Sequence, residues 1–346
     1  MRGLTAGAAF ATNGRMDVFD EIRAGCRYVA EHAELVRIDE ARLAAYASGF
    51  PVAEIGQAGL DPATHWLGRG KETLAFILVL DSINFGSGYF PHLRKRPAPE
   101  GGTLSGYFTV AAGLNDWFRR DGAPDARRLA ALDAAECARI FGQDGTGEAG
   151  AAGPEAAQLM ALFARALNDL GALLLARFDG DPAKLVESAG HSAARLVGIL
   201  RQMPCFDDVA LWRGRQVPIL KRAQITAADL ALAFDNAGWG RFDDRDRLTI
   251  FADNLVPHVL RVDGVLAYAP ELAARLEAGE LIAAGSPEEV EIRAVALHAV
   301  ERLKAQLHEA GQDAVTSVDL DYLLWNRGQD ARYRATARHR TRSVFY

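Results

Sequence analysis

The stretch "GSPEEVEIRAVALHAVERLKAQLHEAG", residues 285–311, carries both the start and the stop signals of an α-helix. Ser286 is a preferred N-cap residue, Pro287 follows at the first helical position, and Glu289 completes a capping box. Gly311 suits the left-handed residue that ends many helices. Apolar residues recur at spacings of three and four in other stretches, and they predict further helices over 16–33, 125–142, 153–180 and 181–204.

Strand signals are few by comparison. A short hairpin is predicted in "VALWRGRQVPIL" (209–220) around Arg213 and Gly214, and a second in "GGTLSGYFTV" (101–110). The sequence contains no alternation of strands with helices and no glycine-rich phosphate-binding motif. The fold class that follows is all-α, with at most short β-hairpins.

The domain organisation follows from the Gly- and Pro-rich stretches. Residues 94–103 and 142–153 have the composition of loops, and the helices on either side of the second are similar in character. We therefore predict a flexible N-terminus at 1–15 and a single helical domain over 16–346.

Composition limits the classes of partner. The 346 residues are 49% hydrophobic and 24% charged, with a net charge of −6, whereas polymeric nucleic acid calls for a basic face. The most apolar run, "LAFILVLDSI" (74–83), is too short to span a bilayer, and the N-terminal residues do not resemble a signal peptide. Three cysteines without metal-binding spacing suit reduced thiols. We expect a cytoplasmic monomer that contacts no membrane and uses no cofactor.

One carboxylate stands where its neighbours have the character of core. "LTIFADNLVPHVL" (248–260) is apolar on both sides of Asp253. An unpaired buried charge costs on the order of several kcal/mol, so such a group is normally paired, protonated or used in chemistry. One interpretation is an N-cap, with a helix beginning at Asn254 and Leu255 and with Pro257 near its first turn. The other is a catalytic carboxylate, and the stretch alone leaves both open.

Another acidic cluster, "FDDRDR" (242–247), is similar to the magnesium-binding motif of all-α isoprenoid synthases. It has Arg247 where the motif requires an acid, and no second carboxylate cluster follows. We interpret it as a solvated loop and helix start, and we predict no metal site in this protein.

Aromatic and polar residues alternate in "SVDLDYLLWNRG" (317–328). If a helix opens at Asp321, then Tyr322 and Trp325 lie on one face and Asn326 lies four residues beyond Tyr322. Aromatic rings beside carboxylate and amide groups suit a planar heterocycle that forms hydrogen bonds. The alternative is an ordinary amphipathic helix that Asp321 caps.

Basic and imidazole side chains supply the remaining candidates. "LKRAQITAADL" (220–230) places Lys221 and Arg222 at the start of a predicted helix, where they could hold a phosphate or extend along the surface. His65 has polar and aromatic neighbours, and a lone histidine can equally be structural.

Taken together, seven stretches resemble the queuosine salvage proteins, the queuosine 5′-phosphate N-glycosylases. They span the chain from roughly residue 60 to its end, and their order and spacing make the resemblance specific. The stretches are "LDSINF" (80–85), "LSGYFTVAAGLN" (104–115), "LKRAQI" (220–225), "TIFADNLVPHVL" (249–260), "GSPEEVEIRAVALHAVE" (285–301), "LDYLLWN" (320–326) and "HRTRSVFY" (339–346).

The resemblance implies an all-α fold related to helix-hairpin-helix DNA glycosylases. It also implies hydrolysis of queuosine 5′-monophosphate to queuine and ribose 5-phosphate. By position, the catalytic aspartate of the family falls on Asp253, its base-binding residues fall on Phe251, Asp321 and Tyr322, and a ligand-contacting histidine falls on His65.

Two further assignments concern contacts to the ligand. Asn326 stands where the family pattern leads us to expect an acid, so a charged contact becomes a neutral hydrogen bond in this chain. Lys221 is the predicted contact of the 5′-phosphate, with Arg222 second, because they are the paired cations in a stretch that matches the family.

The expected chemistry agrees with these residue types. Cleavage of a C–N glycosidic bond builds oxocarbenium charge on the sugar, and a fixed carboxylate in a dry pocket stabilises that charge. Queuine is a 7-deazaguanine and has carbon where purines have N7, so protonation of that position is closed. More of the barrier must then be lowered at the sugar, which favours catalysis by Asp253.

Two alternatives remain open at this stage. The first is a hydrolase of another nucleoside or nucleotide with the same fold. The second is a non-catalytic protein that binds modified nucleosides. Release of queuine from queuosine 5′-monophosphate would separate all three functions.

Overall fold

The computed structural model describes residues 17–56, 59–99, 101–145 and 153–346, so the predicted flexible N-terminus lies outside the described residues. In chain order the elements are α1 (Val18–His32), β1 (Val36–Ile38), α2 (Glu40–Ser48), η1 (Val52–Glu54), α3 (Lys71–Ser82), η2 (Phe90–His92), α4 (Gly106–Asp121), α5 (Ala126–Ala131), α6 (Ala134–Ile140), α7 (Pro154–Arg177), α8 (Pro182–Ser188), α9 (Ala193–Leu200), β2 (Val209–Trp212), β3 (Arg215–Pro218), α10 (Lys221–Ala233), η3 (Gly238–Gly240), η4 (Arg245–Arg247), α11 (Val256–Val262), β4 (Leu266–Tyr268), α12 (Pro270–Glu277), α13 (Pro287–Glu309), α14 (Ser317–Arg327) and α15 (Ala331–Arg334). The prediction of an all-α protein with short hairpins is confirmed.

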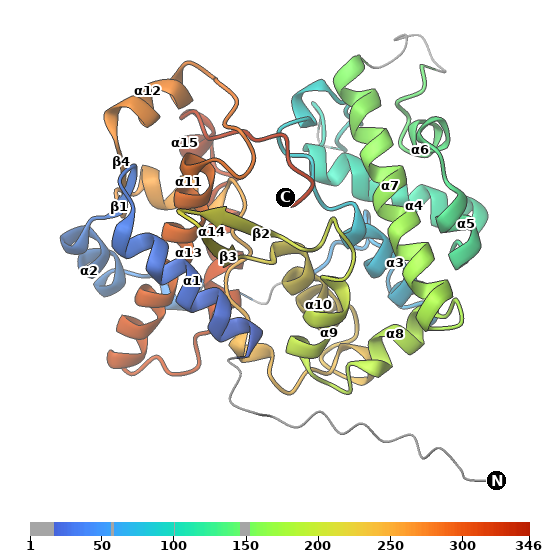
Figure 1. The fold of residues 1–346 in the computed structure, drawn as a ribbon, viewed down its shortest axis with the longest axis horizontal. Helices are drawn as coiled ribbons and strands as arrows, with labels where there is room; N and C mark the ends of the chain where they lie inside the picture. The colour runs from blue at the N-terminus through green and yellow to red at the C-terminus, as the bar shows by residue number, and fades with distance from the viewer. Residues whose placement is uncertain (1–16, 57–58, 100, 146–152) are drawn as a thin grey trace.

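The helices form two adjoining groups (Figure 1). One contains α1, α2 and α11 to α15, the other contains α3 to α10, and the C-terminus lies between them. A single apolar core runs through both, with Phe19 and Leu297 from the first group and Phe76 and Phe163 from the second all fully buried. The two groups are therefore joined by shared hydrophobic burial as well as by the chain.

Helix α13 is the centre of the first group and packs against α1, α2, α11, α14 and β1. Ser286 caps it and Gly311, at φ 85°, follows its end, as predicted. The predicted capping box is modified, because the Glu289 carboxylate accepts the N–H of Gly285 instead of the N-cap N–H. Glu289 also accepts a hydrogen bond from Arg293 at 3.1 Å, which places both charged side chains in the core.

In the second group, α3 is buried along its whole length from Thr73 to Ser82 and packs against α4, α7, α8 and α10. Helix α7 runs through this group (Figure 1) and packs against α3, α5, α6 and α8. By length and composition alone α7 would pass as a membrane span, but half of that apolar stretch is buried inside the protein, and core helices share this composition. We read α7 as such a core helix.

Two small antiparallel sheets complete the fold. The predicted hairpin is confirmed as β2 and β3, joined by Arg213 and Gly214 at φ 48° and 78°, the left-handed geometry of a tight hairpin turn. The second predicted hairpin, over 101–110, is wrong, because Ser105 caps α4 and the chain is helical from Gly106. Strands β1 and β4 pair Val36 with Tyr268, more than two hundred residues apart in the chain. Local sequence patterns do not predict such a pairing.

Two predicted helices are each divided in the structure. The 125–142 stretch forms α5 and α6, because Leu132 is extended and the Asp133 side chain caps the second helix. The 181–204 stretch forms α8 and α9, separated by Gly190 and His191 in left-handed conformation. In both cases a capping side chain inside an apolar periodic run restarts the helix.

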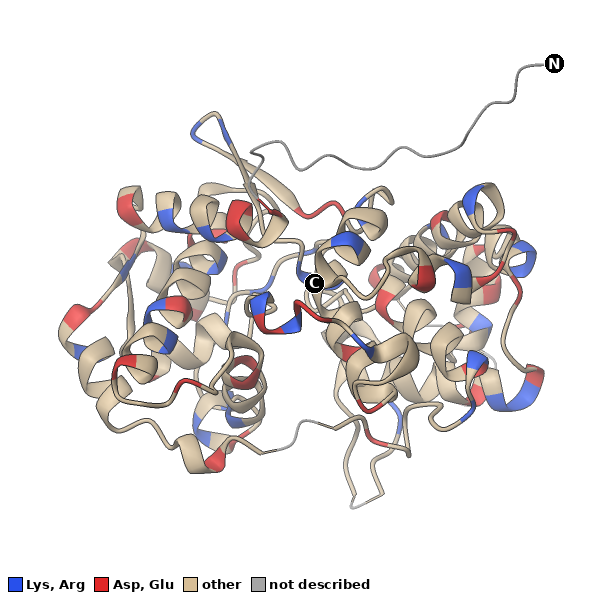
Figure 2. Ribbon diagram, turned by 90° about the horizontal axis from the view of Figure 1, so that it is seen from below, with Lys and Arg blue, Asp and Glu red and all other residues tan. Residues whose placement is uncertain are grey.

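Charged residues of both signs are interspersed along the helices of both groups (Figure 2). The predicted loop-like cluster at 242–247 fits this pattern. Asp244 accepts hydrogen bonds from the backbone N–H groups of Ala193 and Ala194 at the start of α9, and Arg247 pairs with Asp17 at 2.8 Å. These carboxylates therefore serve helix capping and surface pairing.

Candidate active site

A cavity of about 400 Å³ lies where the two groups of helices meet. Its wall is built by α4, α10, α14, the segment before α11 and the C-terminal segment. The structure brings all seven predicted site residues to this wall, namely His65, Lys221, Phe251, Asp253, Asp321, Tyr322 and Asn326. They come from sequence positions up to 261 residues apart, so only folding assembles them.

Asp253 lies in the irregular segment before α11 and is only partly buried. Its Oδ1 accepts the N–H of Leu255 at 2.6 Å, which fixes the carboxylate in a tight local turn. The N-cap interpretation is wrong, because α11 begins at Val256 and Leu255 occupies its N-cap position. Pro257 does lie in the first turn. Asp253 therefore precedes the helix and lines the cavity.

Lys221 is the first residue of α10, after Leu220 at φ 53°, and its backbone N–H donates to Asp208 at 3.2 Å. Asp208 also binds Arg293 of α13 at 2.6 Å, so the start of α10 is fastened to the central helix. Burial lowers the pKa of Lys221, and Asp253 is the neighbour that most strongly raises it. The ammonium is thus buried in the cavity wall, with a carboxylate as its principal charge partner.

Arg222, the second candidate for the phosphate contact, does not line the cavity. Its guanidinium is buried between the rings of Phe85 and Phe206, each 4.7 Å away. It donates to four backbone carbonyls, those of Asp81, Ser82, Cys205 and Val344. The structure therefore corrects the assignment of Arg222 to the phosphate. The guanidinium N–H groups of Arg222 already bind the carbonyls of three chain segments.

Asp321 lies one turn inside α14 and is buried. The alternative that it caps the helix is wrong, because Thr316 caps α14 and Asp319 completes the capping box. Asp321 Oδ1 instead accepts the N–H of Phe251 at 2.9 Å. Burial, reinforced by the Asp253 charge, raises the pKa of Asp321 to about 7. Its other oxygen forms no hydrogen bond to the described residues and remains available to a ligand.

An aromatic wall stands beside these carboxylates. The rings of Phe251 and Tyr322 meet edge to face, with centroids 6.2 Å apart. Trp325 and the exposed Asn326 continue the same face of α14, as their spacing predicted. The buried Tyr322 hydroxyl interacts with the Asp229 carboxyl but forms no hydrogen bond of normal geometry.

His65 closes another part of the wall. Its Nε2 lies 3.1 Å from the Tyr107 hydroxyl, and its Nδ1 lies 3.0 Å from the Asp61 carbonyl and 3.1 Å from Thr64 Oγ1. Burial lowers the pKa of His65, so the ring is neutral at pH 7. A neutral imidazole held on both nitrogens can position a ligand group but carries no charge to it.

Several wall residues were missed from the sequence. Asp229 stands two turns after Lys221 on α10 and is buried. In "LKRAQITAADL", Lys221, Ile225 and Asp229 follow one another at intervals of four residues. This spacing places all three on one face of a helix. Arg338 and Arg340 also line the cavity. Arg340 belongs to the stretch "HRTRSVFY" (339–346), which resembles the family but had no predicted site residue.

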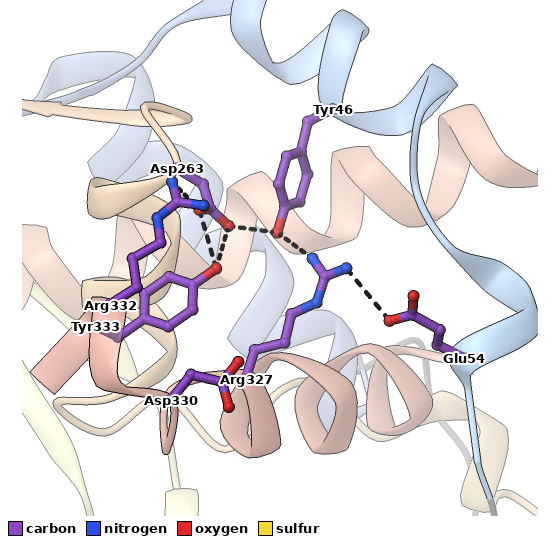
Figure 3. A pocket seen from close by; sticks show the side chains of 7 residues that line it. All are labelled: Tyr46, Glu54, Asp263, Arg327, Asp330, Arg332 and Tyr333. Carbon is purple, nitrogen blue, oxygen red and sulfur yellow. Dashed lines mark hydrogen bonds and ion pairs between the residues drawn. The ribbon is translucent and has the colours of Figure 1, made fainter.

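A second pocket, of about 520 Å³, lies on the other side of α14 (Figure 3). Most of its polar groups pair with one another: Tyr46 and Tyr333 donate to Asp263 at 2.9 and 3.0 Å, and Arg332 pairs with the same carboxylate at 3.1 Å. Arg327 donates to the Tyr46 hydroxyl at 3.3 Å. This network joins α2, α11, α14 and α15.

The fold and the cavity define a helical protein with a carboxylate-bearing cavity, and similarity to known proteins specifies the family. The sequence model of the queuosine salvage protein family matches residues 64–346. A queuosine 5′-phosphate N-glycosylase/hydrolase from Sphaerobacter thermophilus is 40% identical over 324 residues, which are 92% of this chain and 96% of that protein. The Mus musculus protein of the same name is 31% identical over 340 residues, 94% and 98% of the two chains. This chain belongs to the queuosine salvage protein family.

Proposed function

We propose that this protein hydrolyses the N-glycosidic bond of queuosine 5′-phosphate and releases queuine. The observation that carries the proposal is the placement of Asp253 and Asp321 on one cavity wall, where the N–H of Phe251, two residues before Asp253, donates to Asp321. One carboxylate can face the sugar while the other binds the base. The names of the related proteins support the same reaction.

Asp253 is the group proposed to act at the sugar. As the C–N bond lengthens, positive charge develops at the anomeric carbon, and a carboxylate that is already oriented stabilises it without reorganisation. The bond from the Leu255 N–H holds one oxygen in place, and the buried Lys221 lines the same cavity. A water molecule completes the hydrolysis, with Asp253 steering it or taking its proton.

Asp321 is proposed to bind the base. The base keeps the ring N–H and exocyclic amine of guanine, two adjacent donors that match the two oxygens of a carboxylate. With the pKa of Asp321 near 7, binding of these donors favours its ionised form. Phe251 and Tyr322 supply the aromatic surface that a planar heterocycle requires.

Lys221 remains the proposed contact of the 5′-phosphate. Asp253 is the carboxylate that acts most strongly on its ammonium, and a nucleotide spans only a few ångströms between its anomeric carbon and its phosphate. Lys95, Arg338 and Arg340 line the same cavity and are the competing assignment. Turnover of the nucleotide therefore has to be compared with turnover of its nucleoside in variants of each of these four residues.

The activity test is direct. Purified protein is incubated with queuosine 5′-monophosphate, and free queuine and ribose 5-phosphate are measured by mass spectrometry. Release that Asp253→Asn abolishes supports the proposal. Binding without release would identify a non-catalytic binding protein, and release of base only from other nucleotides would identify a different hydrolase.

We also propose that the protein works as a monomer in the cytoplasm. Its cysteines Cys26, Cys137 and Cys205 are free and buried, which suits a reducing compartment. Burial raises the pKa of the Cys137 thiol to about 12, so it is inert at neutral pH. Sedimentation analysis and imaging of a fluorescent fusion test the two statements.

A further inference from the structure

One acidic side chain of the cavity has no part in the reaction described above. Asp229 on α10 lines the cavity and only 4% of it is exposed. It forms no ion pair with any residue in the described part of the chain. The buried Asp208, by contrast, pairs with Arg293 at 2.6 Å. A buried acid without a cationic partner needs a separate explanation.

The surroundings of Asp229 are acidic on several sides. Asp81 of α3 is fully buried nearby, and its Oδ2 has no hydrogen-bond partner. From α14 the Tyr322 hydroxyl interacts with Asp229, and Tyr107 of α4 is close enough for the charges of Asp229 and Asp81 to act on its hydroxyl. Lys221, two turns earlier on α10, is the one cation that acts appreciably on Asp229, and it acts more strongly on Asp253.

Burial and the Asp81 charge together raise the pKa of Asp229 well above its ordinary value, and burial raises the pKa of Asp81 to about 7. Two close carboxyls in a dry wall disfavour joint ionisation. The empty site therefore holds protons that an incoming cation would displace. Such an arrangement costs stability in the free protein, and a cationic ligand would offset that cost.

Under the proposed function, the substrate brings such a cation. The base of queuosine bears at its C7 a methylene group linked to a secondary amine and a cyclopentenediol, and a dialkylamine is protonated at neutral pH. We propose that Asp229, together with the Tyr322 hydroxyl, binds this ammonium group. Asp229 is then the residue that distinguishes the queuosine nucleotide from nucleotides without the side chain. This inference rests on the proposed function and deepens it.

The test compares three nucleotides. Queuosine 5′-phosphate carries the amine and the diol, 7-aminomethyl-7-deazaguanosine 5′-phosphate carries only an ammonium, and 7-deazaguanosine 5′-phosphate carries neither. Asp229→Asn keeps the shape and removes the negative charge. We expect kcat/KM to fall roughly 10- to 100-fold for the first two, the usual value of a hydrogen bond between charged groups. For the third it should change less than about twofold.

A matched control is Asp169→Asn on α7. Asp169 is also partly buried, but it does not line the cavity. This variant should process all three nucleotides as the wild type does. An equal loss on all three substrates in Asp229→Asn, or no loss on any, would overturn the proposal. A change confined to the queuosine nucleotide would assign recognition to the diol and also overturn it.

A measurement on the wild-type protein needs no variant to fold. Binding of queuine and of 7-deazaguanine is followed by calorimetry at pH 7 in two buffers of different ionisation enthalpy. Asp321 releases protons when either base binds. The difference in proton release between queuine and 7-deazaguanine therefore reports the ionisation of Asp229. We expect queuine to release up to one additional proton, and equal release would contradict the assignment. Because binding is measured, this result is separate from whether the protein hydrolyses the nucleotide.

Discussion

Replacing Asp321 by asparagine separates its role in binding from its role in stability. The Asn side chain retains an oxygen that can accept the Phe251 N–H, now held at 2.9 Å. It places an amide donor where the base presents its own donors. At least one donor of the base is then left unpaired in a closed pocket, which costs roughly 1–3 kcal/mol. Affinity for queuine should fall about 10- to 100-fold.

The same substitution should not destabilise the free protein. The pKa of Asp321 is raised from 3.8 to about 7 in the folded state, so its stabilising contribution is complete below pH 4 and is lost as the pH rises to 7. By the usual conversion, this loss is roughly 4 kcal/mol. Asparagine does not ionise, so its free energy of unfolding relative to the wild type should increase between pH 4 and pH 7 and then stay level.

Two measurements check this reasoning. Urea denaturation at pH 5 and pH 8 gives the two stabilities, and calorimetry with queuine over the same pH range gives the affinities. Wild-type affinity should decline below pH 7, where Asp321 is protonated, and the affinity of the variant should lack that dependence. Unchanged queuine affinity together with reduced stability would refute the assignment and leave Asp321 as a structural residue.

Three further predictions address the rest of the site. Asp253→Asn should lower turnover at least about 10²-fold with an unchanged melting temperature, as when one preorganised charge is removed, and near wild-type turnover would exclude catalysis by this carboxylate. Lys221→Ala should raise KM for queuosine 5′-phosphate and barely alter turnover of the nucleoside. An equal effect on both substrates would instead transfer the phosphate to Lys95, Arg338 or Arg340. Exhaustive chelation should leave activity intact, whereas a loss that magnesium restores would require a carboxylate–metal site.

The sequence by itself determined the elements whose signals are local. Ser286, Pro287 and Gly311 delimit α13, and Arg213 with Gly214 turns the β2–β3 hairpin, because caps and tight turns depend on a few adjacent residues. The family resemblance also identified the residues that line the cavity, although it could not show that they meet. Helix interruptions were less accessible, since an apolar period continues through a cap such as Asp133.

Only the tertiary structure decided which member of a neighbouring pair serves the site. Lys221 and Arg222 look alike in the sequence, but consecutive residues of a helix point about 100° apart. One therefore faces the cavity while the other binds backbone carbonyls in the core. Asp229 shows the same limit, because whether an acid is paired depends on elements far away in the chain. Burial and charge pairing are properties of the assembled fold, and no window of sequence contains them.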